Sequence, residues 1–183
     1  MQMDFTENGK RSQANQMMRS SNISVNILTV SDRSFRGERA DKSGPTIIDF
    51  LKENDFLIHD YQIVPDEMDQ IINILSKWTD EKIPLIFTTG GTGFAPRDIT
   101  PEATLAIIEK ETPGISEYLR SRSFQITPHA ILSRAVSGIK NHSLIINLPG
   151  SPKAARESLE FLLPVLPHAI ELLLEDPESE KNH

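Results

Sequence analysis

The sequence predicts a three-layer α/β domain in which helices cover both faces of a mainly parallel sheet that has an antiparallel edge. Short apolar segments rich in β-branched residues alternate with segments whose apolar residues recur every three or four positions. Only the polar turn 140–142 separates the last two predicted strands, and so short a connection indicates an antiparallel pair. Glycines and acidic residues follow several strands, at the edge where open parallel sheets bind ligands.

The first half of the chain is expected to form two strands and two helices. In order, these are a strand over 23–30, a polar loop that ends at Lys42, a helix from Ser43, a strand over 56–64 and a helix from Met68. Asp66 is a natural N-cap for the helix from Met68. Apolar residues then follow at the spacing of a core-facing helical stripe: Met68, Ile71, Ile72, Leu75 and Trp78.

The second half begins with a strand over 85–89, a glycine loop and a helix over about 100–110. Thr100 is predicted to cap this helix, with Pro101 at its first position. A break at 113–114, a helix over 115–124 and an irregular segment from 128 to 134 follow. The antiparallel strands are expected at 135–139 and 144–148, then a second glycine turn over 149–152 and two final helices.

Length and composition favour one globular domain over 22–175, between polar tails at 1–21 and 176–183. The net charge of −7 argues against broad nucleic-acid binding, and no apolar run is long enough for a membrane span. No signal peptide is evident, so we expect a cytoplasmic protein. The chain has no cysteine, which excludes disulfides, thiolate nucleophiles and cysteine-type zinc sites.

The glycine loop that follows the strand over 85–89 predicts an anion-binding site. Gly90, Gly91 and Gly93 let the backbone approach a ligand, and a helix start follows at Thr100. Unpaired N–H groups in such a turn attract phosphate. The spacing matches neither the P-loop nor the dinucleotide fingerprint, because no Gly-Lys follows and Pro96 stands where the last glycine should be.

Asp66 and Asp98 are the carboxylates best placed to act as a pair, because each lies just past a predicted strand or within the glycine loop. Mg²⁺ would explain them, since it takes one or two carboxylates together with phosphate oxygens. The alternatives are that Asp66 only caps its helix and that Asp98 pairs with Arg97 or caps the helix at Thr100. Arg97 is itself a candidate to neutralise phosphate, or else an ordinary surface ion pair.

Five blocks of sequence together resemble the molybdopterin adenylyltransferases, which include the Mog-type enzymes and the G domains of molybdenum-cofactor proteins such as gephyrin. The resemblance covers about residues 23–174. Its blocks are Ile27–Asp32, Val64–Glu67, Thr89–Thr104, Leu132–Arg134 and Asn147–Gly150.

The resemblance implies a trimeric α/β enzyme of the MoaB/Mog-like fold that transfers AMP from Mg·ATP to the terminal phosphate of molybdopterin and releases pyrophosphate. Asp66 and Asp98 would be the catalytic, metal-associated carboxylates. The residues expected to bind substrate are Ser31, Asp32, Thr89, Gly90, Gly91, Thr92, Gly93, Ser133, Pro149 and Gly150. The second domain that inserts molybdate in the two-domain relatives is absent from this sequence, so insertion would require another protein or a part of a longer native chain.

Two alternatives remain at this stage. One is a molybdopterin-binding or scaffold module without adenylylation, and the other is a molybdate-inserting enzyme of related fold. ATP-dependent release of pyrophosphate would distinguish them from the adenylyltransferase.

Overall fold

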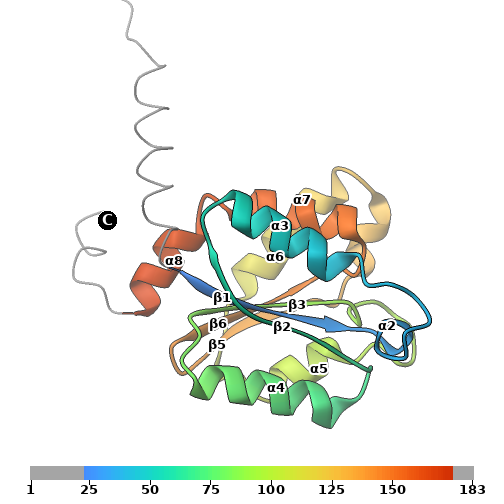
Figure 1. Ribbon diagram of the computed structural model, residues 1–183. Helices are drawn as coiled ribbons and strands as arrows, with labels where there is room; N and C mark the ends of the chain where they lie inside the picture. The colour runs from blue at the N-terminus through green and yellow to red at the C-terminus, as the bar shows by residue number, and fades with distance from the viewer. Residues whose placement is uncertain (1–22, 175–183) are drawn as a thin grey trace, which may run out of the picture.

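The computed structural model describes residues 23–174, and both predicted tails lie outside the described residues (Figure 1). The elements, in chain order, are β1 (Ser24–Val30), α2 (Asp32–Phe35), α3 (Ser43–Glu53), β2 (Leu57–Val64), α4 (Met68–Asp80), β3 (Leu85–Thr89), α5 (Thr100–Leu105), β4 (Lys110–Glu111), α6 (Pro113–Phe124), the 3-10 helix η1 (Pro128–Leu132), β5 (Ser137–Lys140), β6 (Ser143–Leu148), α7 (Pro152–Leu162) and α8 (Leu166–Leu173). Among these residues, no helix is long and apolar enough to cross a membrane.

The elements build one six-stranded sheet in the order β2-β1-β3-β6-β5-β4. β1, β2, β3 and β6 are parallel, whereas β5 runs antiparallel to both β6 and β4. The two-residue turn between β5 and β6 places Asn141 at a φ of 52°, a conformation that asparagine tolerates well. The predicted three-layer fold, with its mainly parallel sheet and antiparallel edge, is confirmed.

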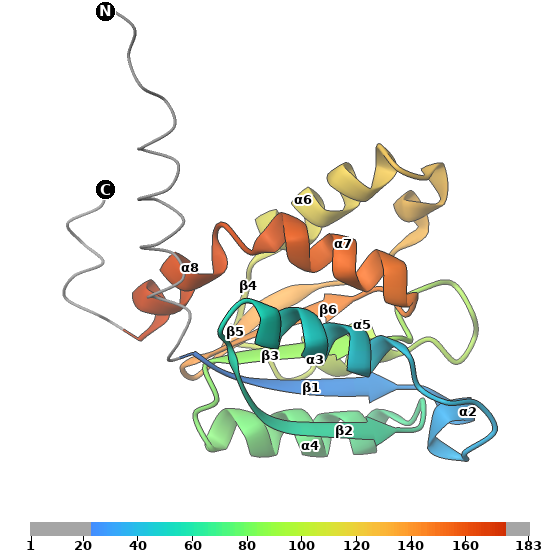
Figure 2. The same ribbon diagram turned by 45° about the horizontal axis from the view of Figure 1, so that its top comes forward.

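Helices cover both faces of the sheet, as Figures 1 and 2 show. Ile27 of β1 belongs to the core beneath α3, α6, α7 and α8, whereas its neighbour Leu28 packs in the core with α4 and α5. Both side chains are fully buried. Successive side chains of a strand point to opposite faces, so a central parallel strand buried on both sides is apolar at consecutive positions.

Several elements differ from the sequence prediction, among them β4, which was not predicted, and β5, which begins at Ser137 rather than at residue 135. The loop after β1 contains the short helix α2, in which the Ser31 hydroxyl accepts a hydrogen bond from the Ser34 N–H at 3.3 Å. Helix α5 ends at Leu105 rather than near residue 110, because the chain turns to form β4 and the Glu109 N–H donates to the Ile139 carbonyl at 2.8 Å. Helix α6 begins at Pro113 rather than at residue 115, since proline suits the first helical position.

A buried side-chain network centred on Asn147 joins the sheet to α5. The Asn147 amide donates to the hydroxyls of Thr88 and Thr104, each at 2.9 Å, and its Oδ1 accepts from the Val136 N–H at 3.2 Å. Asn147 is 1% exposed, so water cannot replace these partners without disturbing the packing. The network therefore fixes β6 against β3 and α5 near the ends of the strands.

We predict that Asn147→Ala lowers the free energy of unfolding by about 2–4 kcal/mol, because it removes three side-chain hydrogen bonds and leaves the Thr88 hydroxyl and the Val136 N–H without this partner. Chemical denaturation with urea provides the measurement. Thr104→Val is the comparison: it removes one of the three partners of Asn147 together with the hydrogen bond from the Thr104 hydroxyl to the Thr100 carbonyl, with an expected loss of about 1–2 kcal/mol. An Asn147→Ala protein that unfolds at the wild-type urea concentration would contradict this role.

Candidate active site

The candidate active site lies at the edge of the sheet where four parallel strands end. Ser31, Asp66, Gly90 and Gly150 lie within two residues of the ends of β1, β2, β3 and β6, respectively. These strands are neighbours in the sheet, so their ends lie side by side. In Figure 1, this is the edge toward which the arrowhead of β1 points, beside α2. Parallel sheets commonly bind their ligands at this edge.

The turn after β3 has a backbone conformation that requires glycine. The φ angles of Gly90 and Gly91 are 94° and 61°. A Cβ at Gly90 would lie 2.3 Å from the Val30 carbonyl oxygen, so this turn packs directly against the end of β1. Thr100 was predicted to cap α5, but Ile99 holds that position. The Thr100 hydroxyl instead donates to the Gly90 carbonyl at 2.8 Å and holds the turn.

A polar cavity of about 220 Å³ opens beside this turn. Seven of the predicted site residues line it: Ser31, Asp66, Thr89, Gly90, Gly91, Asp98 and Gly150. The cavity also has lining residues that the sequence analysis did not select: Thr29, Val30, Arg39, Asp41 and Ser43. The structure thus brings the two predicted carboxylates, from segments after β2 and β3, to one cavity.

Asp66 is held by a reciprocal pair of hydrogen bonds with Asp32. Its Oδ2 accepts from the Asp32 N–H at 2.8 Å, and the Asp66 N–H donates to Asp32 Oδ1 at 3.1 Å. The prediction that Asp66 caps α4 is wrong, because Glu67 is the N-cap and the Asp66 carboxylate turns toward β1. Burial raises the pKa of Asp66, and the negative charges of Asp32 and Asp98 raise it further.

Arg97 is bound to acidic groups outside the polar cavity. Its guanidinium donates to both oxygens of Asp32, at 2.6 and 3.0 Å, to Glu67 Oε1 at 2.7 Å and to the Asp66 carbonyl at 3.0 Å. This contact holds the pKa of Asp32 below its usual value. Asp98 therefore does not pair with Arg97; its Oδ2 instead accepts from the Ala95 N–H at 2.9 Å. Asp32 does not line the polar cavity; it contacts Asp66 and Arg97 instead.

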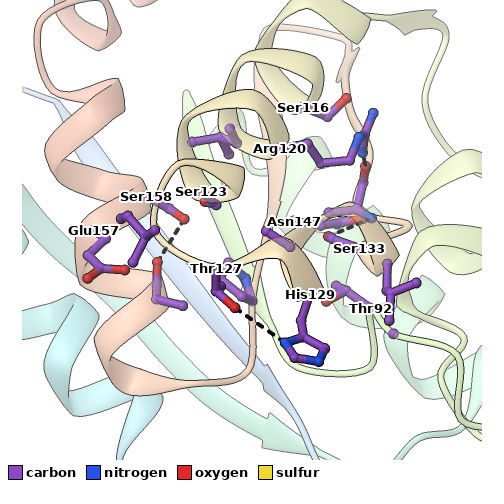
Figure 3. A pocket seen from close by; sticks show the side chains of 18 residues that line it. Thr92, Ser116, Arg120, Ser123, Thr127, His129, Ser133, Asn147, Glu157 and Ser158 are labelled. Atoms are coloured by element: carbon purple, nitrogen blue, oxygen red, sulfur yellow. Dashed lines mark hydrogen bonds between the residues drawn. The ribbon is translucent and has the colours of Figure 1, made fainter.

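A second, larger and mostly apolar cavity of about 310 Å³ lies on the other side of the glycine turn (Figure 3). Side chains from α6, η1, β6 and α7 surround it, among them Leu119, Ile126, His129, Leu132 and Ala154. All but Asp32 of the remaining predicted site residues line this cavity: Thr92, Gly93, Ser133 and Pro149. Its surface is mostly apolar, and several hydroxyl, amide and charged side chains lie around it, a combination that suits a heterocyclic ring with polar substituents.

Consecutive residues of both glycine turns line different cavities. In the first turn, Gly91 lines the polar cavity and Thr92 lines the apolar one. In the second turn, Gly150 lines the polar cavity and Pro149 lines the apolar one. The Thr89 hydroxyl donates to the Pro149 carbonyl at 2.8 Å, and the Ser43 hydroxyl donates to the Gly150 carbonyl at 2.7 Å. The first bond joins the end of β3 to the second glycine turn, and the second bond fixes that turn to α3.

Asp41 is a site residue that the sequence reasoning missed. Its carboxylate accepts from the N–H groups of Ser43 and Gly44 at 2.8 and 3.1 Å, and from the hydroxyls of Thr29 and Tyr61 at 2.7 and 2.5 Å. It therefore anchors the loop that precedes α3 to the polar cavity. An aspartate two residues before a helix start was the available signal, because such residues bind helix N–H groups.

The fold and the two cavities define an α/β domain with a ligand-binding site at the carboxyl edge of its sheet. The chain belongs to the molybdopterin-binding domain family, since the model described as a probable molybdopterin binding domain matches residues 26–168.

Similar proteins come from several organisms. A molybdopterin adenylyltransferase of Helicobacter pylori is 47% identical over 156 residues, which cover 83% of this chain and 88% of that enzyme. Gephyrin of Dictyostelium discoideum is 45% identical over 85% of this chain, which spans only 23% of gephyrin. The crystal structure of the molybdopterin biosynthesis enzyme MoaB from Thermus thermophilus is 51% identical, with a TM-score of 0.80, over 85% of this chain and 98% of that one.

We predict opposite stability effects at pH 7 for Asp66→Asn and Asp32→Asn. The raised pKa of Asp66 means that its ionised form is disfavoured in the folded protein, so the asparagine stabilises it. The lowered pKa of Asp32 means that its ionised form is favoured, so the asparagine destabilises the protein.

The pH dependence separates the two effects. The gain in stability from Asp66→Asn should disappear as the pH falls from 7 toward 3.8, because the wild-type Asp66 becomes protonated as the pH passes its raised pKa. The loss of stability from Asp32→Asn should persist down to pH 3.8. It should decline only below that pH, because the wild-type Asp32 stays ionised in the folded protein until the pH reaches its lowered pKa. Thermal unfolding of both variants and the wild type between pH 3 and 7 gives the comparison, and changes of the same sign at pH 7 would contradict this electrostatic assignment.

Proposed function

We propose that this chain is a molybdopterin adenylyltransferase that transfers AMP from ATP to the terminal phosphate of molybdopterin in molybdenum cofactor biosynthesis. The position of both glycine turns between an apolar and a polar cavity is the observation that carries the proposal. A heterocycle in the apolar cavity would direct its phosphate past the turn toward Asp66 and Asp98. The similarity to the H. pylori adenylyltransferase, which extends over 88% of that enzyme, supports this chemistry.

The reaction makes one phosphorus–oxygen bond and breaks another. An oxygen of the molybdopterin phosphate attacks the α-phosphorus of ATP, and the bond from that phosphorus to the bridging oxygen of pyrophosphate breaks. A phosphate monoester has a second pKa of about 6, so at neutral pH the nucleophile is mostly dianionic and scarcely needs a base. The protein must therefore hold two polyanions in line and offset their charge.

The residues of the polar cavity fit Mg²⁺, which we propose as the metal. Asp66 and Asp98 supply carboxylate oxygens, the donor type that Mg²⁺ prefers, and their mutual repulsion contributes to the raised pKa of Asp66. A cation between them would relieve that repulsion. When bound, Mg²⁺ would offset negative charge on the phosphate oxygens. The backbone of the glycine turn and the side chains of Ser31 and Arg39 would position those oxygens.

The finer parts of the proposal follow the same family. We propose a cytoplasmic homotrimer in which residues 22–175 form one catalytic domain, with ATP and molybdopterin as substrates. A separate protein would then insert molybdate into the adenylylated product. Incubation of the purified protein with Mg·ATP and molybdopterin should release pyrophosphate. Molybdopterin binding without pyrophosphate release would instead support a non-catalytic binding module.

We predict that Asp98→Asn lowers turnover by about 100-fold or more, with little change in molybdopterin affinity, because the charge acts on the transferring phosphate. The asparagine retains an oxygen that can accept from the Ala95 N–H, so the loop should keep its shape. Pyrophosphate release at saturating Mg·ATP measures the effect. Asp69→Asn, an exposed change on α4, is the matched control. Wild-type turnover in Asp98→Asn would rule out the assigned role.

We predict that Arg39, rather than Arg97, provides cationic charge to the bound phosphates. Arg39 is the only basic residue among the described residues that line the polar cavity, whereas Arg97 is bound to Asp32 and Glu67. Arg39→Gln should weaken binding of magnesium pyrophosphate roughly tenfold, the loss of one charge-assisted hydrogen bond. Calorimetric titration measures it. Arg36→Gln, in the same loop but paired with Glu38, should bind as the wild type does; equal losses in both variants would contradict the prediction.

A further inference from the structure

The segment 92–98 joins the glycine turn to Asp98, and it is poorly anchored by burial. Phe94 is 68% exposed, and the neighbouring residues through Arg97 are exposed as well. Within the segment, the Asp98 N–H donates to the Ala95 carbonyl at 2.8 Å, and the Ala95 N–H donates back to Asp98 Oδ2. These contacts fold the segment locally but do not place it relative to the sheet.

Arg134, which follows η1, provides that placement. Its Nε donates to the Gly93 carbonyl at 2.7 Å, and its Nη2 donates to the Asp98 carbonyl at 2.6 Å. Its backbone N–H also donates to the Thr92 carbonyl at 2.9 Å. One guanidinium and one backbone amide thus hold both ends of the segment. The remaining Nη1 pairs with the carboxylate of Glu102 on α5.

The chemistry of the guanidinium gives this arrangement its rigidity. Arginine presents several N–H groups in a planar fork, so two carbonyls bound to one fork have a fixed separation and direction. A lysine ammonium is a compact charge on a flexible stem and does not impose that geometry. On the opposite side of the segment, Arg97 binds Asp32 and the Asp66 carbonyl. Asp98 therefore lies between two arginine contacts, one to the glycine turn and one to the end of β2.

We propose that Arg134 is a positioning residue that holds the Asp98 carboxylate at its place beside Asp66 in the lining of the polar cavity. The inference rests on the proposed adenylyl transfer for its effect on turnover, and on the loop geometry alone for its effect on structure. The Arg134 side chain is one-third exposed and its contacts are confined to this segment and Glu102. Its loss should therefore displace Asp98 without unfolding the domain.

The test compares Arg134→Gln and Arg134→Lys with Glu102→Gln. The control removes the ion pair but leaves both carbonyl contacts of Arg134 in place. Each purified protein is measured for kcat and KM with Mg·ATP and molybdopterin, for amide hydrogen exchange over 90–99, and for thermal unfolding.

Displacement of a catalytic group by about 1 Å can cost on the order of 100-fold in rate, so we expect kcat to fall by about that factor in Arg134→Gln while KM for ATP stays within about twofold. Exchange over 92–98 should be faster, and the unfolding midpoint should stay close to that of the wild type. Arg134→Lys should restore the charge but not the turnover. Glu102→Gln should match the wild type in turnover and in exchange.

Three results would overturn the inference: wild-type exchange in Arg134→Gln, full turnover in Arg134→Lys, or an equal loss in Glu102→Gln. A wild-type protein that releases no pyrophosphate would contradict the proposed function instead. The exchange measurement would still decide whether Arg134 holds the segment, so the two failures are distinguishable.

Discussion

The direct packing of the Gly90 backbone against the Val30 carbonyl is the constraint on which the site depends. A side chain at Gly90 would collide with that carbonyl. Gly150 packs against Gly90 in turn, because a Cβ added to Gly150 would lie 3.2 Å from the Cα of Gly90. These contacts bring the ends of β1, β3 and β6 closer than side chains would allow. Because the backbone itself forms the partition, a polar cavity and an apolar one lie on either side of a single turn.

Electrostatics divides the acidic residues of this edge into two groups. The contact with Arg97 lowers the pKa of Asp32, whereas burial and the negative charges of Asp32 and Asp98 raise the pKa of Asp66. Each residue donates its backbone N–H to the carboxylate of the other, yet their pKa values shift in opposite directions. Asp32 thereby stabilises the fold, while Asp66 retains unsatisfied charge that a cation in the polar cavity can use.

The fold was predictable because its signal is local and repeated: apolar strands, helical stripes such as Ile71 to Trp78, and turns with glycine or proline. Parallel strand ends also share one edge, so Asp66 and the glycine turn were placed together from chain order alone. The bonds of Asp41 to the N–H groups of Ser43 and Gly44 had a local signal, but its contacts with Thr29 and Tyr61 and those of Arg134 depend on side-chain directions set by tertiary packing. Arg97 shows the same limit: its sequence neighbour Asp98 was the obvious partner, but the fold presents Asp32 and Glu67.

The shared partition between the cavities has a thermodynamic consequence. Gly91 and Thr92 are consecutive residues that line different cavities, so a ligand that shifts the turn from one side alters the shape offered on the other. Such a shift would link occupancy of the two cavities, and the coupling free energy would be the same in both directions: the first substrate would change the affinity for the second by the factor by which the second changes the affinity for the first. A turn of four residues, 90–93, thus gives the domain a route to cooperative substrate binding within one chain.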